Sequence, residues 1–237
     1  MTEKLFLSDP YLAEAEATVV AVTDVGVVLD ASIYYAQGGG QPGDTGSLAW
    51  DGQDVEVVNA VKGEGDAIVL LLPEGAPRPA VGQAVTQRLD WDRRHRHMRV
   101  HTALHLLSVV IPLPVTGGAI TAEKGRLDFD MPEAPEDKAA LQAELDALIA
   151  RDLPVGEDWI TDAELEANPG LVKTMSVKPP TGAGRVRLVR IGEGEAQVDL
   201  QPCGGTHVAR TGEIGAVTLG KIEKKGRQNR RVNLHLV

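Results

Sequence analysis

The sequence contains very little cysteine and no long apolar run. A single cysteine among 237 residues excludes a disulfide within the chain and suits a reducing compartment. No segment reaches the ~20 consecutive apolar residues of a membrane span, and acidic residues occur early, where a signal peptide would be apolar. We therefore expect a soluble, cytoplasmic protein.

Chain length and hydrophobic content favour two domains of modest size. A chain of 237 residues that is 43% hydrophobic can bury one large core or two smaller ones, and two is the usual solution near this length. A strand pattern gives way to an Arg/His-rich segment near residues 88–93. We expect an N-terminal domain at residues 1–90 and a second domain at residues 91–237.

Basic residues are concentrated in two segments of an acidic chain. The net charge is −10, yet residues 88–100 hold five arginines against two aspartates. Residues 221–237 hold six basic residues against one glutamate. Such segments could attract a polyanion to one face of the protein, and they are equally compatible with ordinary solvated surface.

The first ninety residues have the character of β structure. Short valine-rich stretches alternate with Gly, Pro and Asp turns, a spacing that predicts a small β-barrel. The expected strands are a hairpin within residues 17–30 and further strands at 54–61, 67–72 and 80–89.

The remaining residues predict an α+β domain with a mainly antiparallel sheet. Apolar residues at helical spacing indicate an amphipathic helix at residues 136–151 and a weaker one at 161–168. The other expected elements are a turn and strand at 117–131, a loop at 177–184, a hairpin of residues 185–191 and 196–200, and strand or short helix segments at 208–219 and 231–237.

Two short motifs carry three imidazoles and the only thiol of the chain. They are His101-Thr-Ala-Leu-His105 and Cys203-Gly-Gly-Thr-His207. Residues four apart on a helix share a face, so the first pair can bind one ion, and the apolar repeat at residues 98–111 predicts that helix. Two glycines allow the second pair to converge. Three histidines and a cysteine form a ligand set for one Zn²⁺ ion.

The same residues also have an ordinary structural interpretation. An isolated pair of histidines on a helix is more often half-buried and hydrogen-bonded, and a lone cysteine is usually a small buried hydrophobe. The presence of both motifs in one chain favours the metal site.

A glycine-rich stretch lies within the predicted barrel. It holds five glycines between Gly38 and Gly46. Each glycine loses much backbone entropy on folding, so the run exceeds what a turn requires and suits a loop whose backbone approaches a ligand. The alternative is a wide β-turn or bulge. The stretch lacks the lysine of a phosphate-binding loop.

Five motifs together resemble those of one family. HTALHLL at residues 101–107, CGGTHV at 203–208, TGEIG at 211–215, GRQNRRV at 226–232 and GGGQPGDTG at 38–46 are similar to motifs of the alanyl-tRNA synthetase editing domain. The similarity is greatest to its free-standing relatives, the AlaX trans-editing proteins, of the longer type with an N-terminal barrel. It covers most of the chain from about Ile33 onward.

The resemblance implies a hydrolase rather than a ligase, because no aminoacylation domain or ATP-binding signature is present. The implied reaction removes serine mainly, and glycine as a second candidate, from mischarged tRNA(Ala). Zinc would polarise the ester carbonyl and lower the pKa of water to about 7.

The resemblance also suggests which other residues take part. In the family a threonine after the first metal helix resembles a selector for the serine hydroxyl, and Thr121 is the nearest candidate. The candidates for substrate binding are Gln41, Asp44, Thr121, Gln201 and Thr206, and those for contacts to tRNA phosphates are Arg227, Arg230 and Arg231. Each substrate candidate could equally be an ordinary turn or cap residue.

Four protein ligands would fill a zinc tetrahedron, whereas a catalytic zinc usually keeps an open position. We expect either a loosely held His207 or an expanded coordination, and the alternative is a metal that mainly positions the substrate. Full coordination also supports an alternative function, a structural-zinc module that binds tRNA without hydrolysing it. A third hypothesis, a hydrolase of small esters that is independent of RNA, is disfavoured by the basic segments.

Overall fold

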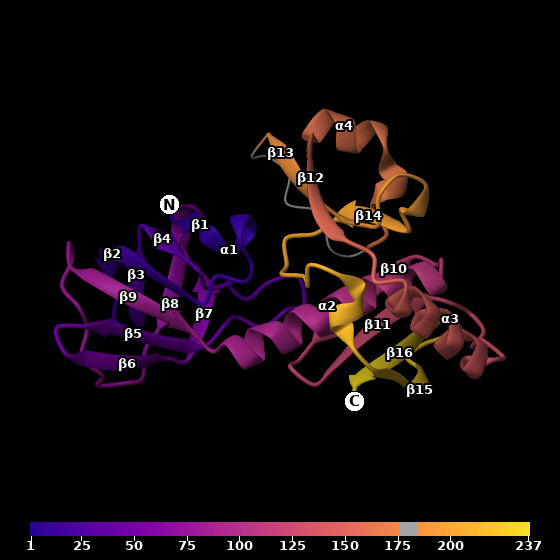
Figure 1. The fold of residues 1–237 in the computed structure, drawn as a ribbon, viewed down its shortest axis with the longest axis horizontal. Coiled ribbons are helices and arrows are strands. Elements are labelled where there is room, and N and C mark those ends of the chain that lie inside the picture. Colours follow the sequence, from indigo (N-terminus) through magenta and orange to yellow (C-terminus); the bar gives the residue numbers. More distant parts are fainter. Residues whose placement is uncertain (176–183) are drawn as a thin grey trace. The chain divides into compact units, whose positions relative to one another are not determined.

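The computed structural model of the chain describes residues 1–175 and 184–237. The chain forms two compact units, an N-terminal unit (Met1–Arg96) and a C-terminal unit (His97–Val237). The division falls inside helix α2 (Trp91–Val110), which contributes residues to both (Figure 1). The loop predicted at residues 177–184 lies outside the described residues except for Gly184.

The N-terminal unit is built on a seven-stranded antiparallel sheet with the strand order β6-β5-β9-β2-β3-β8-β7. Its strands are β2 (Glu14–Val22), β3 (Gly26–Leu29), β5 (Gly46–Trp50), β6 (Gln53–Val57), β7 (Asn59–Lys62), β8 (Ile68–Leu71) and β9 (Ala84–Leu89). A parallel pair, β1 (Glu3–Lys4) and β4 (Ala31–Ser32), and helix α1 (Leu5–Ser8) complete it. The predicted hairpin at residues 17–30 is confirmed as β2 and β3.

The predicted barrel is not confirmed, because the sheet is open. The expected single strand at residues 54–61 is two strands, β6 and β7, with only Val58 between them. β6 pairs with β5 and β7 pairs with β8, and no ladder joins β6 to β7 within the described residues. The two edges of the sheet therefore meet along the chain at Val58 without hydrogen-bonding to each other.

A buried ion pair connects the glycine-rich stretch to the start of α2. The Arg94 side chain is fully buried, and its Nε donates to both carboxylate oxygens of Asp44, at 3.1 and 3.0 Å. The same guanidinium donates to the carbonyl oxygens of Ile33 (2.7 Å) and Pro10 (2.9 Å). Asp44 also accepts the backbone N–H of Tyr35 at 2.6 Å. This network satisfies a charge pair whose burial would otherwise be unfavourable.

Glycines of this stretch are required by the backbone of the unit itself. Gly40 has a φ of +87°, a conformation that other residues rarely adopt. A Cβ on Gly43 would lie 2.1 Å from the Ala60 carbonyl oxygen, where no side chain fits. The backbone of the unit thus explains Gly40 and Gly43 without a ligand, which agrees with the turn interpretation of the stretch.

Within the described residues, the C-terminal unit contains two antiparallel sheets, three α-helical segments and short 3-10 turns. One sheet has the order β10-β11-β16-β15 and the other β12-β13-β14. The strands are β10 (Val115–Ile120), β11 (Lys124–Asp130), β12 (Val155–Thr161), β13 (Arg185–Ile191), β14 (Asp199–Pro202), β15 (Val217–Lys224) and β16 (Asn229–Leu236). The helices are α3 (Lys138–Ala150), α4 (Asp162–Ala167) and the part of α2 that follows Arg96. The α+β class and the mainly antiparallel pairing are confirmed.

Local signals explain where the helices begin. Asp137 caps α3 by accepting the Ala140 N–H at 2.9 Å, and Thr161 forms a capping box with Glu164 at the start of α4. Helix α2 begins at Trp91, earlier than the apolar repeat predicts, since the preceding Arg/His-rich segment is helical as well. Both amphipathic helices predicted from the sequence are therefore confirmed.

Helix α2 packs closely against β11 at Gly125, where a larger residue would force neighbouring side chains to shift. A Cβ on Gly125 would lie 2.7 Å from Val100 Cγ1 and 3.0 Å from Leu104 Cδ1. Val100 and Leu104 are buried on α2, on either side of His101 in the sequence.

Among the helices of the described residues, none combines the length and apolar character needed to cross a membrane.

Replacing Arg94 by methionine leaves the Asp44 carboxylate buried without its partner. We expect the free energy of unfolding of the N-terminal unit to fall by about 3–5 kcal/mol. Amide hydrogen exchange in β2, β3 and β9 measures this loss. Arg88→Met is the matched control, because Arg88 is half-exposed and paired with the exposed Glu14, and it should leave exchange unchanged. Equal effects of the two substitutions would contradict the role given to the buried pair.

Candidate metal centre

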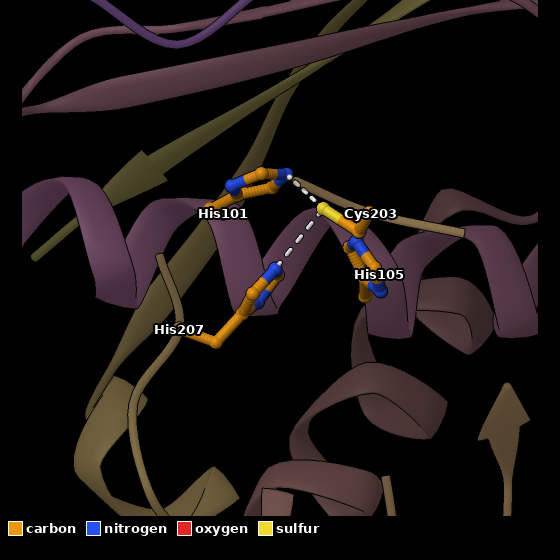
Figure 2. A group of neighbouring side chains, drawn as sticks. All are labelled: His101, His105, Cys203 and His207. Carbon is orange, nitrogen blue, oxygen red and sulfur yellow. Dashed lines mark hydrogen bonds between the residues drawn. The ribbon is translucent and has the colours of Figure 1, made fainter. Parts of the chain in front are cut away.

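Two imidazoles of the centre come from adjacent turns of α2. His101 and His105 are four residues apart and project from the same face of the helix (Figure 2). His105 is buried and His101 is partly exposed. Because Val100, Leu104 and Leu107 anchor the helix in the core, both rings have fixed positions on it.

The other two ligand groups come from the loop that follows β14. The Cys203 N–H donates to the Arg187 carbonyl at 3.2 Å, which continues the pairing of β14 with β13. Arg187 Nη1 in turn donates to the carbonyl oxygens of Cys203 (3.1 Å) and Gly205 (3.0 Å). This arginine therefore fixes the path of the loop that ends at His207.

The four donor groups converge on one point. One donor atom from each of His101, His105, Cys203 and His207 lies within 4.8 Å of the other three. Cys203 Sγ is 3.3 Å from His207 Nε2 and 3.6 Å from His101 Nε2 (Figure 2). Three imidazole nitrogens and a thiol at this separation match the donor set of a single zinc ion.

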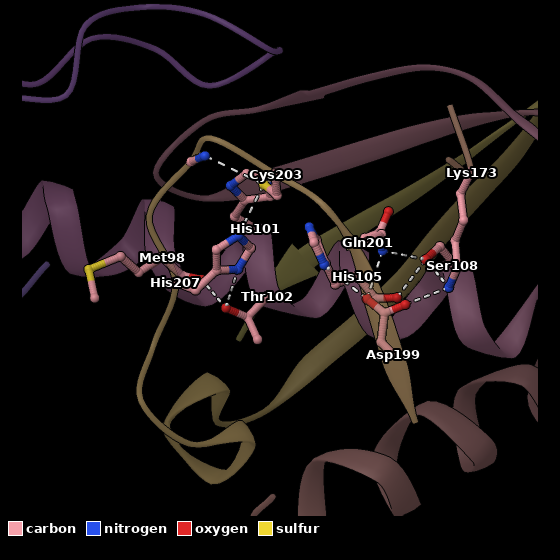
Figure 3. Close-up of polar contacts among 11 residues, drawn as sticks. Met98, His101, Thr102, His105, Ser108, Lys173, Asp199, Gln201, Cys203 and His207 are labelled. Atoms are coloured by element: carbon pink, nitrogen blue, oxygen red, sulfur yellow. Dashed lines mark hydrogen bonds and ion pairs between the residues drawn. The ribbon is translucent and has the colours of Figure 1, made fainter. Parts of the chain in front are cut away.

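Hydrogen bonds outside the cluster orient two of the imidazoles. His105 Nδ1 contacts Asp199 Oδ2 at 3.0 Å, which leaves Nε2 for the cluster. Thr102 Oγ1 donates its only proton to the Met98 carbonyl at 2.9 Å, so it accepts from His207 Nδ1 at 3.1 Å (Figure 3). The lone pair of His207 Nε2 then faces the centre, as a metal ligand requires.

Asp199 contacts several polar residues that lie outside the cluster of four donor groups. Its buried carboxylate accepts from Lys173 Nζ at 2.6 Å and from Gln201 Nε2 at 2.7 Å, in addition to His105 (Figure 3). Ser108 Oγ donates to the His105 carbonyl at 2.7 Å and lies 3.3 Å from Gln201 Nε2. Every polar atom of this carboxylate is therefore satisfied within the unit.

The pKa values show how strongly these groups interact. Burial raises the pKa of the Cys203 thiol, but the imidazoles of His101 and His207 hold it well below its ordinary value. Burial and the neighbouring His101 lower the pKa of His207 to about 3. Burial also lowers the pKa of His105, yet hydrogen bonds to Asp199 and Cys203 raise it to about 9.

Asp199 shows the same competition. Burial raises its pKa, but the hydrogen bond with His105 and the nearby Lys173 lower it to about 2. The centre thus contains a partly buried thiolate and a buried carboxylate, both of which are stabilised by positive charge beside them. A divalent cation between the four donor groups meets this requirement.

The structure places the predicted substrate residues of the C-terminal unit in different surroundings. Gln201 belongs to the network around Asp199, and Thr206 is buried in the loop between Cys203 and His207. Thr121 is exposed in the turn between β10 and β11. Its hydroxyl donates to the Lys124 carbonyl and accepts backbone N–H groups of the same turn.

Gln41 and Asp44 belong to the N-terminal unit, where both are buried. The segment from Gln37 to Pro42 lines a hollow of about 330 Å³. Asp44 is committed to Arg94 and to the Tyr35 backbone. In that unit Asp44 fixes the path of the glycine-rich stretch.

The three arginines predicted to contact tRNA lie at the turn between β15 and β16 and on β16. Arg227 is exposed. Arg230 is buried and donates to the Gly226 carbonyl at 3.0 Å and to the Pro132 carbonyl, whereas Arg231 pairs with Asp128 at 2.7 Å. Of the three, Arg227 has its guanidinium most accessible to a large ligand.

Sequence reasoning missed Asp199, Lys173 and Ser108. Asp199 and Gln201 precede Cys203 at steps of two residues, so all three side chains point to the same face of β14 and its continuation. That alternation could have indicated Asp199 as an outer partner of the metal. Lys173 follows no such pattern, since it lies outside helix and strand.

Comparison with known proteins gives matches to two family models. The model described as the threonyl and alanyl tRNA synthetase second additional domain matches residues 186–233. The model described as tRNA synthetases class II (A) matches residues 6–93.

Full-length relatives are also found. The chain is 37% identical to the alanyl-tRNA editing protein AlaX-M of Methanosarcina mazei, with all of this chain and 97% of that protein covered. It is 33% identical to the protein of the same name from Saccharolobus solfataricus, with 98% of each chain covered. It is 36% identical to the alanine–tRNA ligase of Pyrobaculum arsenaticum, of which it covers only 25%.

Metal binding tests the centre without reference to catalysis. We expect metal-free protein to bind one Zn²⁺ per chain, and Co²⁺ in its place to give the absorption of thiolate coordination. Cys203→Ala should abolish that absorption and lower the zinc content. Retention of one tightly bound ion per chain by this variant would contradict the assignment of Cys203.

Asp199→Ala tests whether the polar residues outside the cluster support metal binding. The loss of the carboxylate that orients His105 should weaken zinc binding about 10- to 100-fold, measured by competition with a chelator. Asp158→Ala is the matched control, since Asp158 is paired with Arg190 on the opposite face of the same sheet and should leave the affinity unchanged.

Proposed function

The chain belongs to the alanyl-tRNA editing proteins of the AlaX-M family, and on that premise we propose that it hydrolyses mischarged tRNA(Ala) in trans. The bond cleaved is the ester that joins the wrong amino acid, mainly serine and also glycine, to the 3′ end of the tRNA. The observation that carries this proposal is the convergence of three imidazoles and a thiolate in one cluster, of which His105 and His207 are buried and His101 and Cys203 partly exposed. The protein acts as a hydrolase and requires no ATP.

The ligand residues would hold one Zn²⁺ ion, which when bound supplies Lewis acidity toward an ester carbonyl and lowers the pKa of water. The protein residues orient that site. Asp199 holds the Nδ1 proton of His105, and Thr102 accepts the Nδ1 proton of His207. A loosely held His207 finds no support in these contacts, because its ring is buried and hydrogen-bonded, whereas His101 is the more exposed imidazole.

Gln201 is the substrate candidate with the best support from the contacts of the C-terminal unit. Its Nε2 donates to Asp199 and Ser108, so the amide cannot rotate freely (Figure 3). The carbonyl oxygen of the same amide then has a fixed direction and is suited to accept the hydroxyl proton of a serine substrate. A fixed acceptor for a hydroxyl would discriminate strongly against the methyl group of alanine.

The remaining predicted residues have weaker roles in this proposal. Thr206 would shape the loop that carries the ligands, and Gln41 and Asp44 would act through the glycine-rich stretch of the N-terminal unit. Thr121 stays a prediction for the amino-acid selector. Arg227, Arg230 and Arg231 would form the basic side of the β15–β16 hairpin, with Arg227 as the phosphate contact.

A structural-zinc module that binds tRNA without hydrolysis is the second candidate. Its support is the presence of four protein ligands, which fill a tetrahedral zinc. It predicts that removal of the metal unfolds the centre and that the loaded protein leaves aminoacyl-tRNA intact.

Deacylation in trans separates the two functions. We expect purified, metal-loaded protein to remove serine from Ser-tRNA(Ala) and to spare Ala-tRNA(Ala). Cys203→Ala should be inactive, and Gln201→Leu should retain its metal but lose most of the preference for serine. Stability of both esters in the presence of loaded protein would favour the structural-zinc module.

The salt dependence of tRNA binding tests Arg227. Loss of one phosphate contact should weaken binding and lower the slope of log K against log salt by about 1. Arg227→Ala is suited to this measurement, since the side chain is exposed. Arg78→Ala, an exposed arginine outside both basic segments of the sequence, serves as the control. An unchanged slope for Arg227→Ala would remove it from the interface.

A further inference from the structure

Trp159 is more exposed than any other Phe, Tyr or Trp residue among the described residues. Its side chain is 40% exposed, and all other Phe, Tyr and Trp residues, each within the described part of the chain, are buried or half-buried. Trp159 lies on β12, an edge strand of the sheet β12-β13-β14. Single exposed apolar side chains are common on protein surfaces, so a role for this indole is inferred from its neighbours.

Strand register places Trp159 on the face of the sheet that carries the metal ligand. Trp159 pairs with Arg187, and the next residue in that cross-strand row is Cys203, whose N–H donates to the Arg187 carbonyl. Side chains of directly opposed residues project from the same face of a sheet. Trp159, Arg187 and Cys203 therefore share one face.

The distance along this row suits a nucleoside ester. Two strand spacings separate the backbone of Trp159 from that of Cys203, which corresponds to about 10 Å. In an aminoacyl-tRNA the ester is attached to the ribose of the terminal adenosine, so ester and base are neighbours within one nucleotide. A base stacked on Trp159 would thus lie within one nucleoside length of the cluster that holds Cys203.

The surroundings of the indole have the chemistry of a nucleotide-binding surface. The guanidinium carbon of Arg185 lies 5.7 Å from the centre of the Trp159 ring, in a cation–π contact. Trp159 Nε1 contacts Glu157 Oε1 at 3.3 Å, which orients the ring in its plane. Proteins that bind single-stranded nucleic acids stack the bases on aromatic side chains, with arginine adding cation–π contacts. The oriented indole of Trp159 beside Arg185 offers this combination.

We propose that Trp159 and Arg185 form a stacking platform for the terminal adenine of the acceptor strand. The inference rests on the proposed function, because that function supplies the nucleotide attached to the ester. Arg187 connects the platform to the centre, since its guanidinium contacts Glu157 on β12 and the carbonyl groups of Cys203 and Gly205. The platform binds the base, and the cluster receives the ester.

Binding of unacylated RNA tests the platform without any need for catalysis. The probes are a minihelix that ends in CCA and the same minihelix without its terminal adenosine. With metal-loaded full-length protein, we expect removal of the adenosine to weaken binding about 5- to 100-fold, the range of stacking on one aromatic ring. Trp159→Ala should bind both RNAs equally, and Trp159→Phe should retain most of the discrimination.

Arg190→Ala is the matched control. Arg190 lies on β13, as Arg185 does, but pairs with Asp158 on the opposite face of the sheet. It should discriminate between the RNAs as the unmodified protein does, whereas Arg185→Ala should discriminate less. If Trp159→Ala still distinguishes the two RNAs as well as the unmodified protein, the platform is wrong and Trp159 serves only to stabilise the edge strand.

Hydrolysis distinguishes this inference from the proposed function. On a serine-charged minihelix we expect Trp159→Ala to raise KM and to leave kcat close to that of the unmodified protein. If the unmodified protein distinguishes the two RNAs through Trp159 but does not cleave the serine ester, the platform holds and the editing function fails. If it cleaves the serine ester with the same KM after Trp159→Ala, editing holds and the platform fails.

Discussion

Two negative charges, one buried and one partly buried, determine the polar contacts around the candidate metal centre of the C-terminal unit. The carboxylate of Asp199 is buried and the thiolate of Cys203 is partly buried, and each requires positive charge or hydrogen-bond donors. His105 lies between them and contacts both. The polar groups near the centre, from Lys173 to Thr102, follow from this requirement, because an unsatisfied charge at either position would be strongly destabilising.

The ligand motifs and most elements could be predicted from sequence because they depend on local spacing. Helical periodicity places His101 and His105 on one face, and the strand before Cys203 brings the second motif to them. The partners of Asp199 depend instead on contacts between residues far apart in the chain, such as Lys173. No local pattern contains that information.

The N-terminal unit shows the opposite limitation. Most of its strands were predictable from valine-rich stretches and turns, although β5 (Gly46–Trp50) was not expected. Closure of a sheet depends instead on which edges hydrogen-bond to each other. Val58 divides one predicted strand into two, which pair with different neighbours and leave the sheet open. The glycine-rich stretch was interpreted through its composition, whereas the backbone of Ala60 and the left-handed turn at Gly40 account for the glycines there. Composition alone cannot tell whether a run of glycines makes room for a ligand or for neighbouring backbone of the same chain.

The contact at Gly125 connects two apolar residues, Val100 and Leu104, to the positions of the histidines on α2. Val100 and Leu104 fill the space in which a side chain at position 125 would lie, and they flank His101 on the helix. A methyl group there would force the side chains of Val100 and Leu104 to shift, on the same turns of α2 that carry His101 and His105. Residues far from any reactive atom can therefore disturb the cluster. Among sequence variants found in nature, glycine should predominate at position 125.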